Sequence, residues 1–164
     1  MSTKPAQYSG LSVRKLNIFD LYPIFKWRND KDSRKFSYNP KSFNFLEHLI
    51  WYLSNLKNSN QYRYIFTLNL KRICFVNFTN LFNNEIFIIS INMNPKFRGL
   101  GLSRKVLFLA EKQILRDCHE CTILAEIHKD NSTSLNLFLG ADYLQEVGEV
   151  ENFLIFSKDL REEF

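Results

Sequence analysis

The residues best suited to chemistry are two glycines in a short turn between an apolar run and a helical pattern. Gly99 and Gly101 follow the run Ile86–Met93, which has the length and composition of a buried strand. Glycines let a ligand come close to the backbone, and the first amides of a helix have no partner within it. The helix dipole adds a partial positive charge, to which Arg98 can add a full one. The spacing therefore indicates a cradle for phosphate groups.

The turn does not match the common nucleotide-binding motifs. A Walker loop requires G-x-x-x-x-G-K-[ST], which the sequence lacks. The Rossmann fingerprint requires a third glycine, and Arg104 stands at that position. The alternative to a phosphate cradle is an ordinary turn from a strand into a helix.

The rest of the chain is expected to supply the elements that position this turn. Asp20 is predicted to cap a first helix, and Asn44 with Glu47 forms the pattern of a capping box before a second. The segment 31–40 is predicted to be a loop. Strands are predicted at about 11–14, 62–68, 73–78, 86–93, 122–127, 143–147 and 152–156, and helices at about 20–29, 44–56, 101–116 and 132–139. The predicted order is β-α-α-β-β-β-α-β-α-β-β.

Length and composition indicate one globular domain. The chain has 164 residues, of which 45% are hydrophobic, so it can bury a sizeable core. We expect a flexible N-terminus over residues 1–10 and a single domain over 11–160. No apolar run is long enough to span a membrane, and no secretory leader precedes the domain, so the sequence predicts a cytoplasmic protein without a membrane partner.

Charge and cysteine content exclude few partners. The net charge is +5, but the basic residues are scattered and no nucleic-acid-binding motif is present, so no nucleic-acid partner is predicted. An anionic small ligand or a solvated basic surface accounts for the excess equally well. Cys118 and Cys121 have C-x-x-C spacing, but no second ligand pair follows them. We therefore expect reduced thiols and no metal site.

The glycine turn resembles motif A of the GNAT acetyltransferases, [RQ]-x-x-G-x-[GA] after a strand and a proline. Arg98, Gly101 and Ser103 occupy its key places, and Gly99 is the usual extra glycine. The resemblance covers nearly the whole chain, because the predicted element order also matches. It implies an α/β GNAT fold: a twisted, mostly antiparallel mixed sheet with helices on both sides.

A second stretch resembles the later family pattern N-x-x-[AS]-x-x-[LF]-Y-x-x-x-G-F. Asn131, Ser134 and Tyr143 match in place. The family tyrosine, which often acts as general acid toward the departing thiolate, is replaced by Phe138, and the family glycine by Asp142. A phenyl ring has no proton to donate, so that role does not carry over.

The resemblance implies acetyl-CoA as cosubstrate and no metal. It assigns the acetyl group and the pantetheine arm to main-chain groups at the end of the central strand, and the pyrophosphate to amides of the turn. Asn131, at the start of the last predicted helix, is also expected to contact the arm. The implied cofactor-binding residues are Ile91, Asn92, Met93, Arg98, Gly99, Leu100, Gly101, Leu102, Ser103, Asn131 and Phe138.

A Trp-Arg-Asn segment at the end of the first predicted helix resembles two GNAT branches. Trp27, Arg28 and Asn29, with His48 in the next helix, look nearer to the PseH-like enzymes, which acetylate a nucleotide-linked amino sugar. The RimJ/RimL-like branch acetylates protein N-termini. The resemblance implies that these four residues bind the substrate. The implied acceptor is a small-molecule amine, most simply a nucleotide amino sugar. A homodimer is possible in this family.

The implied chemistry is direct acyl transfer from acetyl-CoA to a neutral amine. Glu85 and Glu126, near the ends of predicted strands, are candidate proton acceptors, and a water relay is an alternative. Ser134 or water is expected to reprotonate the thiolate. Three hypotheses follow: an amino-sugar N-acetyltransferase, a protein N-terminal acetyltransferase, and a CoA-binding module without turnover.

Overall fold

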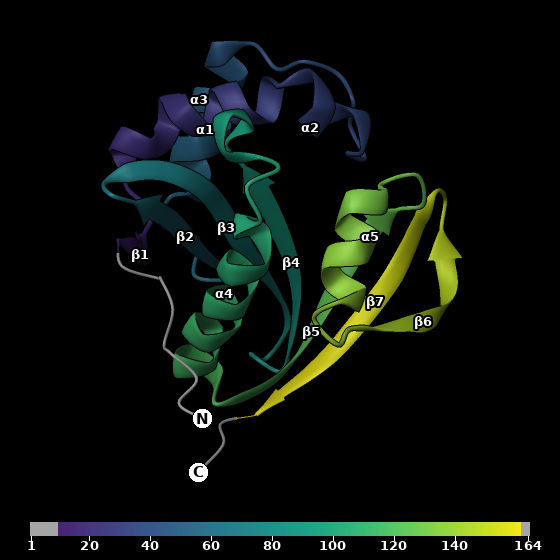
Figure 1. The fold of residues 1–164 in the computed structure, drawn as a ribbon. Coiled ribbons are helices and arrows are strands. Elements are labelled where there is room, and N and C mark those ends of the chain that lie inside the picture. The colour runs from purple at the N-terminus through teal and green to yellow at the C-terminus, as the bar shows by residue number, and fades with distance from the viewer. Residues whose placement is uncertain (1–9, 162–164) are drawn as a thin grey trace, which may run out of the picture.

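One seven-stranded sheet organises the computed structural model, which describes residues 10–161 (Figure 1). The strand order is β1-β2-β3-β4-β5-β7-β6. All neighbouring pairs are antiparallel except β4 and β5, which are parallel. The strands are β1 (Leu11–Lys15), β2 (Gln61–Leu68), β3 (Lys71–Phe82), β4 (Ile86–Met93), β5 (Glu120–His128), β6 (Leu144–Val150) and β7 (Phe153–Arg161).

The helices lie on both sides of this sheet, so the expected fold class is confirmed. They are the short 3-10 helix η1 (Ile18–Asp20), α1 (Leu21–Asn29), α2 (Lys31–Lys35), α3 (Phe45–Asn55), the 3-10 turn η2 (Pro95–Phe97), α4 (Leu102–Cys118) and α5 (Ser132–Leu139). No helix among residues 10–161 is long and apolar enough to cross a membrane. The expected flexibility of the N-terminus falls almost entirely outside the described residues.

The predicted loop 31–40 is wrong in its first half, because α2 occupies it. The Asp30 side chain accepts a hydrogen bond from the Ser33 amide at 3.1 Å and so starts the helix. This cap is an Asp three residues before a Ser, within a run of polar residues that has no apolar periodicity. The sequence therefore contains an N-cap residue for this helix but lacks the hydrophobic pattern that normally identifies a helix.

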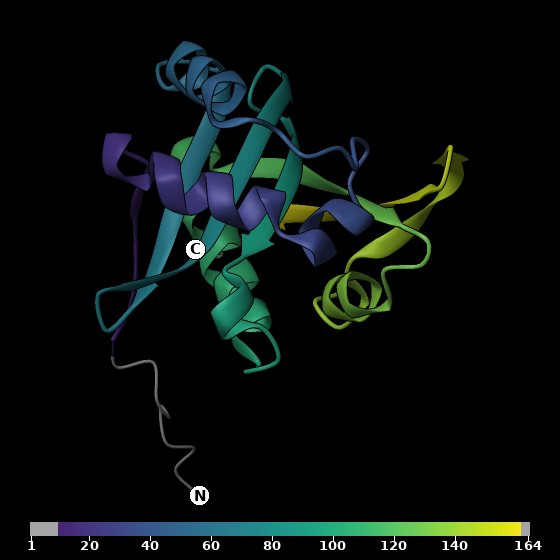
Figure 2. The same ribbon diagram turned by 90° about the horizontal axis from the view of Figure 1, so that it is seen from above.

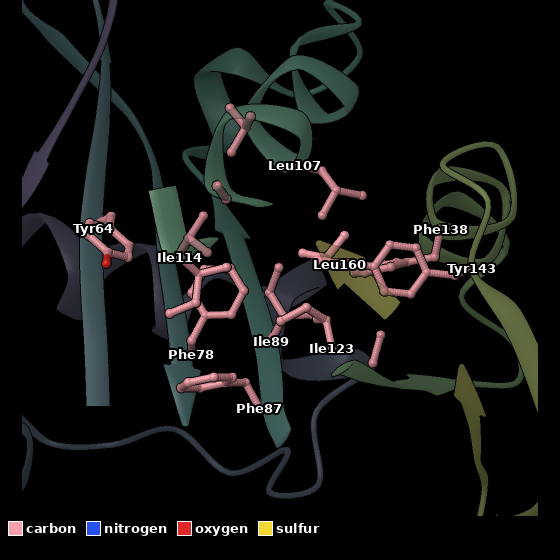
Figure 3. Packing of buried hydrophobic residues seen from close by; sticks show 14 of the residues in the cluster. Tyr64, Phe78, Phe87, Ile89, Leu107, Ile114, Ile123, Phe138, Tyr143 and Leu160 are labelled. Atoms are coloured by element: carbon pink, nitrogen blue, oxygen red, sulfur yellow. The ribbon is translucent and has the colours of Figure 1, made fainter. Parts of the chain in front are cut away.

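Two hydrophobic clusters cover the two faces of the sheet. The larger lies under α4 and α5, and we call that side the α4 face; Leu107, Ile114 and Phe138 meet Phe78 and Ile123 there (Figure 3). The smaller lies under α1 and α3, on what we call the α1 face, where α1 runs across the strands (Figure 2). Its members are Ile24, Trp27, Tyr52, Ile65 and Phe75.

The two central parallel strands part halfway along their length. Pairs between β4 and β5 end at Ile88 and Leu124, although β4 continues to Met93 and β5 to His128. Each strand remains paired on its other side, β4 with β3 and β5 with β7. The sheet therefore holds a V-shaped opening between two well-supported strands (Figure 1).

The prediction that the Asp20 side chain caps α1 is wrong. Its carboxylate is fully buried and makes no cap bond to α1; it receives hydrogen bonds from Arg14 at 2.6 and 2.7 Å and from Arg72 at 2.7 Å. It also accepts from the Asn17 amide at 3.0 Å. Burial alone would raise the pKa of Asp20, but these partners outweigh it and lower the pKa below its usual value. The cluster fastens the start of α1 to β1 and β3.

We expect Asp20→Ala to lower the free energy of unfolding by about 2–3 kcal/mol, because it leaves two arginines without their shared carboxylate. The estimate is at the low end for a buried pair because Arg14 and Arg72 are 36% and 37% exposed and can be rehydrated. The pKa of Asp20 is lower in the folded than in the unfolded protein, so its ionised carboxylate stabilises the fold above about pH 4. This stabilisation is lost as the pH falls through the pKa of Asp20 in the folded protein. The difference from wild type in urea unfolding should therefore shrink at acid pH. Asp130→Ala, whose side chain is exposed, should change stability little at either pH.

Candidate active site

The glycine turn has the geometry of an open anion cradle. Gly99 and Gly101 have positive φ values of 73° and 69°, a region that disfavours other residues. A Cβ added at either position would meet nothing within 4 Å, so the space over the turn is empty. Helix α4 begins at Leu102 with no side chain bonded to its first amides and no acidic residue in its first turn. These amides are therefore free of side-chain caps and can donate hydrogen bonds to an anion, and the phosphate site there stays a prediction.

The Arg98 side chain turns away from this role toward α2. Its guanidinium donates to the Asp30 carboxylate at 2.7 Å and to the Ser33 hydroxyl at 2.7 Å. Ser33 lies 3.3 Å from the Asn92 amide oxygen on β4. Two acidic side chains, Asp30 and Asp32, offset the charge of Arg98. Its guanidinium thus ties the turn to α2, and the helix amides rather than this side chain supply the positive potential of the cradle.

The predicted arm-binding residues lie along the opening between the parted strands. Ile91, Asn92 and Met93 form the end of β4, past its last pair with β5. Asn131 caps α5 across the opening, and its side-chain oxygen accepts from the Ser134 amide at 3.2 Å. Asn131 is therefore the helix cap that the sequence predicted. The turn, the end of β4 and the start of α5 together surround the gap through which an extended thioester arm can reach the sheet.

Phe138 is a core residue rather than a polar group at the opening. It is 5% exposed and packs edge-on against Tyr143, with ring centroids 4.9 Å apart. Tyr143 is also buried, and burial raises the pKa of its phenol, with the nearby Glu111 carboxylate acting in the same direction. Neither ring is therefore a convenient proton donor. Ser134, on the first turn of α5, is partly exposed.

On the α1 face, the opening is bordered by polar side chains. Glu126 and Ser90 each lie two residues past the last β4–β5 pair, Leu124 with Ile88, and therefore at the same level on opposite sides of the gap. Ser90 is exposed although it belongs to a central strand. Its cross-strand partner Asn77 has a buried side-chain oxygen that no described residue bonds. These polar atoms at the centre of the sheet are available to hydrogen-bond a ligand or water.

Glu85 lies at the other end of β4. Its main chain closes the β3–β4 turn by bonding to Phe82 and receives the Thr122 amide of β5 at 2.7 Å. The whole length of β4, Ile86–Met93, separates it from the glycine turn. The structure thus brings Glu126 and Ser134 to the opening and leaves Glu85 far from it.

A second hollow lies beside the ends of α1 and α3. It is a cavity of about 420 Å³. Two predicted substrate residues, Arg28 and His48, line it together with Asn39, Lys41, Ser42, Phe43, Glu47 and Trp51. Trp27 is in the core of the α1 face. Asn29 uses both atoms of its amide to hold the Phe43 main chain at 2.9 Å. These two residues therefore position the cavity wall without lining it.

Three charged side chains line this cavity, the cations Arg28 and Lys41 and the carboxylate Glu47. The Arg28 guanidinium lies over the rings of Phe43 and Trp51, at 4.6 and 5.2 Å from their centroids. Desolvation by the surrounding protein lowers the pKa of Arg28. No acidic side chain of residues 10–161 forms an ion pair with it. His48 is 2% exposed, and its Nε2 has no hydrogen-bond partner in the described part of the chain. Burial lowers the pKa of His48, with the Arg28 charge acting in the same direction, so the ring is neutral near pH 7.

Comparison with known proteins agrees with this geometry. The profile of the Acetyltransferase (GNAT) family matches residues 21–141, and the chain belongs to that family. It is accordingly an acetyltransferase that uses acetyl-CoA to acetylate an amine. Among residues 10–161 no cluster of three or more His, Cys, Asp or Glu side chains is placed to hold a metal ion. Comparison with curated proteins gave no significant match.

Solved structures share the fold at low identity. A domain from Methanocaldococcus jannaschii has a TM-score of 0.79 at 21% identity, over 92% of this chain and 98% of that one. Vibrio cholerae spermidine N-acetyltransferase, solved with CoA and spermine, has a TM-score of 0.79 at 17% identity, over 93% and 95%. Campylobacter jejuni PseH has a TM-score of 0.70 at 16% identity, over 94% and 99%. At these identities the likeness concerns the fold and does not identify the acceptor.

Several site residues were missed from the sequence because their contacts span long stretches of chain. Asp30 and Ser33 meet Arg98 across more than 60 positions. Phe43, in the connection before α3, and Trp51, on α3, lie against Arg28. The sequence pattern assigned no role to either residue. The only sequence signal for them was the presence of aromatic residues beside a polar segment.

We expect Gly101→Val to weaken CoA binding at least tenfold in titration calorimetry. A β-branched residue at positive φ is strained by about 1–3 kcal/mol, and its side chain would occupy the open space above the cradle amides. Gly148→Val is the matched control, since Gly148 also has a positive φ, of 125°, and open space around it, but lies in β6. It should lower stability while CoA affinity stays the same. Unchanged CoA affinity in a folded Gly101→Val protein would show that the cradle is elsewhere.

Proposed function

We propose that this acetyltransferase acts on the amino group of a nucleotide-linked amino sugar. The observation that carries the proposal is the cavity at the ends of α1 and α3, which combines an unpaired cation with aromatic rings. Guanidinium groups bind phosphates through charge-assisted hydrogen bonds, and aromatic walls suit the flat face of a base. A volume of about 420 Å³ is within the usual range for small-molecule sites.

A short segment with several hydrogen bonds connects the cavity to the glycine turn. Arg28 is followed by Asn29, which holds the Phe43 main chain, and then by Asp30, which binds Arg98 of the cradle turn. The end of α1 therefore fixes the cavity wall and the cofactor turn at once. An acceptor bound at Arg28 by its phosphates can direct an amine toward the opening between β4 and β5.

Charge distinguishes this acceptor from two alternatives. Spermidine N-acetyltransferases share the fold, but the lining of this cavity has two cations, Arg28 and Lys41, against one carboxylate, Glu47, and this balance favours an anion over a polycationic polyamine. A protein N-terminus, the acceptor of the RimJ/RimL-like branch, needs an extended groove rather than a compact cavity. The panel that separates them contains nucleotide amino sugars, free amino sugars, spermidine and N-terminal peptides, with release of the CoA thiol as the readout. Turnover of peptides or spermidine, with none of any nucleotide amino sugar, would overturn the proposal.

We expect Arg28→Ala to raise the KM for a nucleotide amino sugar about 10- to 100-fold while the KM for acetyl-CoA stays the same. A charge-assisted hydrogen bond to phosphate is worth about 1.5–3 kcal/mol, and about 1.4 kcal/mol corresponds to a factor of ten. Lys26→Ala is the matched control, because Lys26 lies on the same helix but stacks over Tyr22 outside the cavity. Equal effects of the two variants would argue against a phosphate at Arg28.

We expect Phe138→Tyr to give less than a tenfold gain in turnover. The ring is packed in the core, so an added hydroxyl would be buried there instead of reaching the leaving thiolate. A thiol has an unperturbed pKa of about 8.5, so a thiolate can leave near neutral pH and take its proton from water. Steady-state rates measured across pH, beside Ser134→Ala, test this. A gain of tenfold or more would show that wild type lacks a general acid.

A further inference from the structure

We propose that Asp30 and Ser33, on the acceptor side of the protein, position the glycine turn for CoA and that they act through Arg98. Both are positioning residues, because their bonds go to Arg98 and not to the empty space over the turn. The inference rests on CoA binding at the glycine turn and does not depend on which amine is the natural acceptor.

The glycine turn depends on its neighbours to hold its shape. Gly99 and Gly101 both have positive φ values, and glycines have more backbone freedom to lose than other residues. Leu100 between them is 63% exposed, so its side chain does not fix the tip. Leu102 packs on the core of the α4 face and fixes the turn at its helix end. At the strand end, the bonds of Arg98 decide how well the turn amides are ordered before a ligand arrives.

The Arg98 guanidinium lies among groups from the start of α2 and the end of β4. It donates to the Asp30 carboxylate and the Ser33 hydroxyl, each at 2.7 Å, and to the main-chain oxygen of Met93 at 3.4 Å. The Asp32 carboxylate is farther away, at 3.7 Å, and is 83% exposed. The side chains of Arg98 and Asp30 are only 30% and 24% exposed, so water weakens their pair less. Asp30 is therefore the main partner of Arg98.

Ser33 extends these bonds to the central strand. Its hydroxyl accepts from Arg98 and donates to the side-chain oxygen of Asn92 at 3.3 Å, so α2 lies beside the end of β4 (Figure 2). Asn92 and Met93 lie past the last pair of β4 with β5, where the thioester arm is expected. One guanidinium thus joins α2, the end of the strand and the glycine turn.

The start of α2 also belongs to the acceptor side. The Asp30 carboxylate accepts from the Ser33 amide at 3.1 Å and so caps α2. Asn29, the residue before it, holds the Phe43 main chain through both atoms of its amide. Phe43 lines the cavity at the ends of α1 and α3. The acceptor cavity and the cofactor turn therefore share one support, and Asp30 stands at the junction.

The experiment measures CoA affinity by titration calorimetry. Asn caps helices as well as Asp does, so Asp30→Asn keeps the start of α2 and removes the charge that holds Arg98. We expect it to weaken CoA binding about tenfold, because a less ordered turn must be ordered by the ligand. Asp32→Asn is the matched control, since it removes the same charge from the weaker and more exposed contact. It should not weaken CoA binding.

The direction of the change separates positioning from simple repulsion. Each variant removes one negative charge near the place where the anionic cofactor is expected, so repulsion alone predicts tighter CoA binding by both. Positioning predicts weaker binding by Asp30→Asn only. CoA affinity of Asp30→Asn equal to or higher than that of wild type would overturn the inference, and so would an equal loss in Asp32→Asn.

A double-mutant cycle tests whether Asp30 acts through Arg98. Arg98→Ala alone should weaken CoA binding about tenfold, and the double variant should bind CoA no more weakly than Arg98→Ala. Losses that add to about a hundredfold would show that Asp30 acts by another route. Ser33→Ala should cause a smaller loss, of about threefold, because it removes a neutral acceptor from a bond that Asp30 still supports.

Steady-state kinetics with the amine that the enzyme turns over best give a second readout. Asp30→Asn should raise the KM for acetyl-CoA while kcat stays within about twofold of wild type, because the reacting groups are unchanged. A lower kcat with an unchanged KM would contradict a positioning role.

Gly101→Val distinguishes this inference from the placement of the cofactor. If Gly101→Val and Asp30→Asn both leave CoA affinity unchanged, CoA binds elsewhere and both ideas are wrong. If only Gly101→Val weakens binding, CoA binds at the turn and the role of Asp30 is refuted.

Discussion

The separation of β4 from β5 is the constraint on which the rest of the structure depends. Buried main-chain N–H and C=O groups must find partners, so a sheet cannot open at its centre unless each strand is held from its other side. Here β3 holds β4 as far as Met93, and β7 holds β5 as far as His128. The opening that results exposes main-chain groups of both strands between two rigid walls. A ligand with an amide-containing arm is the natural partner for such groups.

Each face of the sheet contributes a different part of the site because its helices are placed differently. On the α4 face, α4 starts at the glycine turn and α5 at Asn131, so the positive ends of two helices lie beside the opening, where they would favour an anionic cofactor. On the α1 face, α1 and α3 cover β2 and β3 but leave Ser90 and Glu126 uncovered. The cofactor side is thus made mainly of main chain, and the acceptor side mainly of side chains. This division explains why one fold can keep its cofactor while its acceptors vary.

The segment from Asn29 to Phe43 connects these two sides. It bonds to the cradle turn through Asp30 and Arg98, to β4 through Ser33 and Asn92, and to β5 and β7 through aromatic contacts. Its two carboxylates, Asp30 and Asp32, form ion pairs with Arg98, whereas Arg28 just before it has no ion-pair partner among residues 10–161. Arg28 is exposed and lies over two aromatic rings, so its guanidinium is accessible to the anionic ligand that we propose.

The sequence by itself determined the strand, glycine turn and helix of the cofactor cradle, because period, glycine spacing and helix start are local properties that neighbouring residues fix. It also predicted the order of the elements apart from α2, and the capping roles of Asn44 and Asn131. Only the tertiary structure decided that Asp20 is a buried ion-pair centre, that Arg98 bonds to α2, and that Tyr38 stacks on Phe153. Each of these contacts joins residues from different elements. Their geometry depends on how the sheet twists and parts, which no local pattern in the chain encodes.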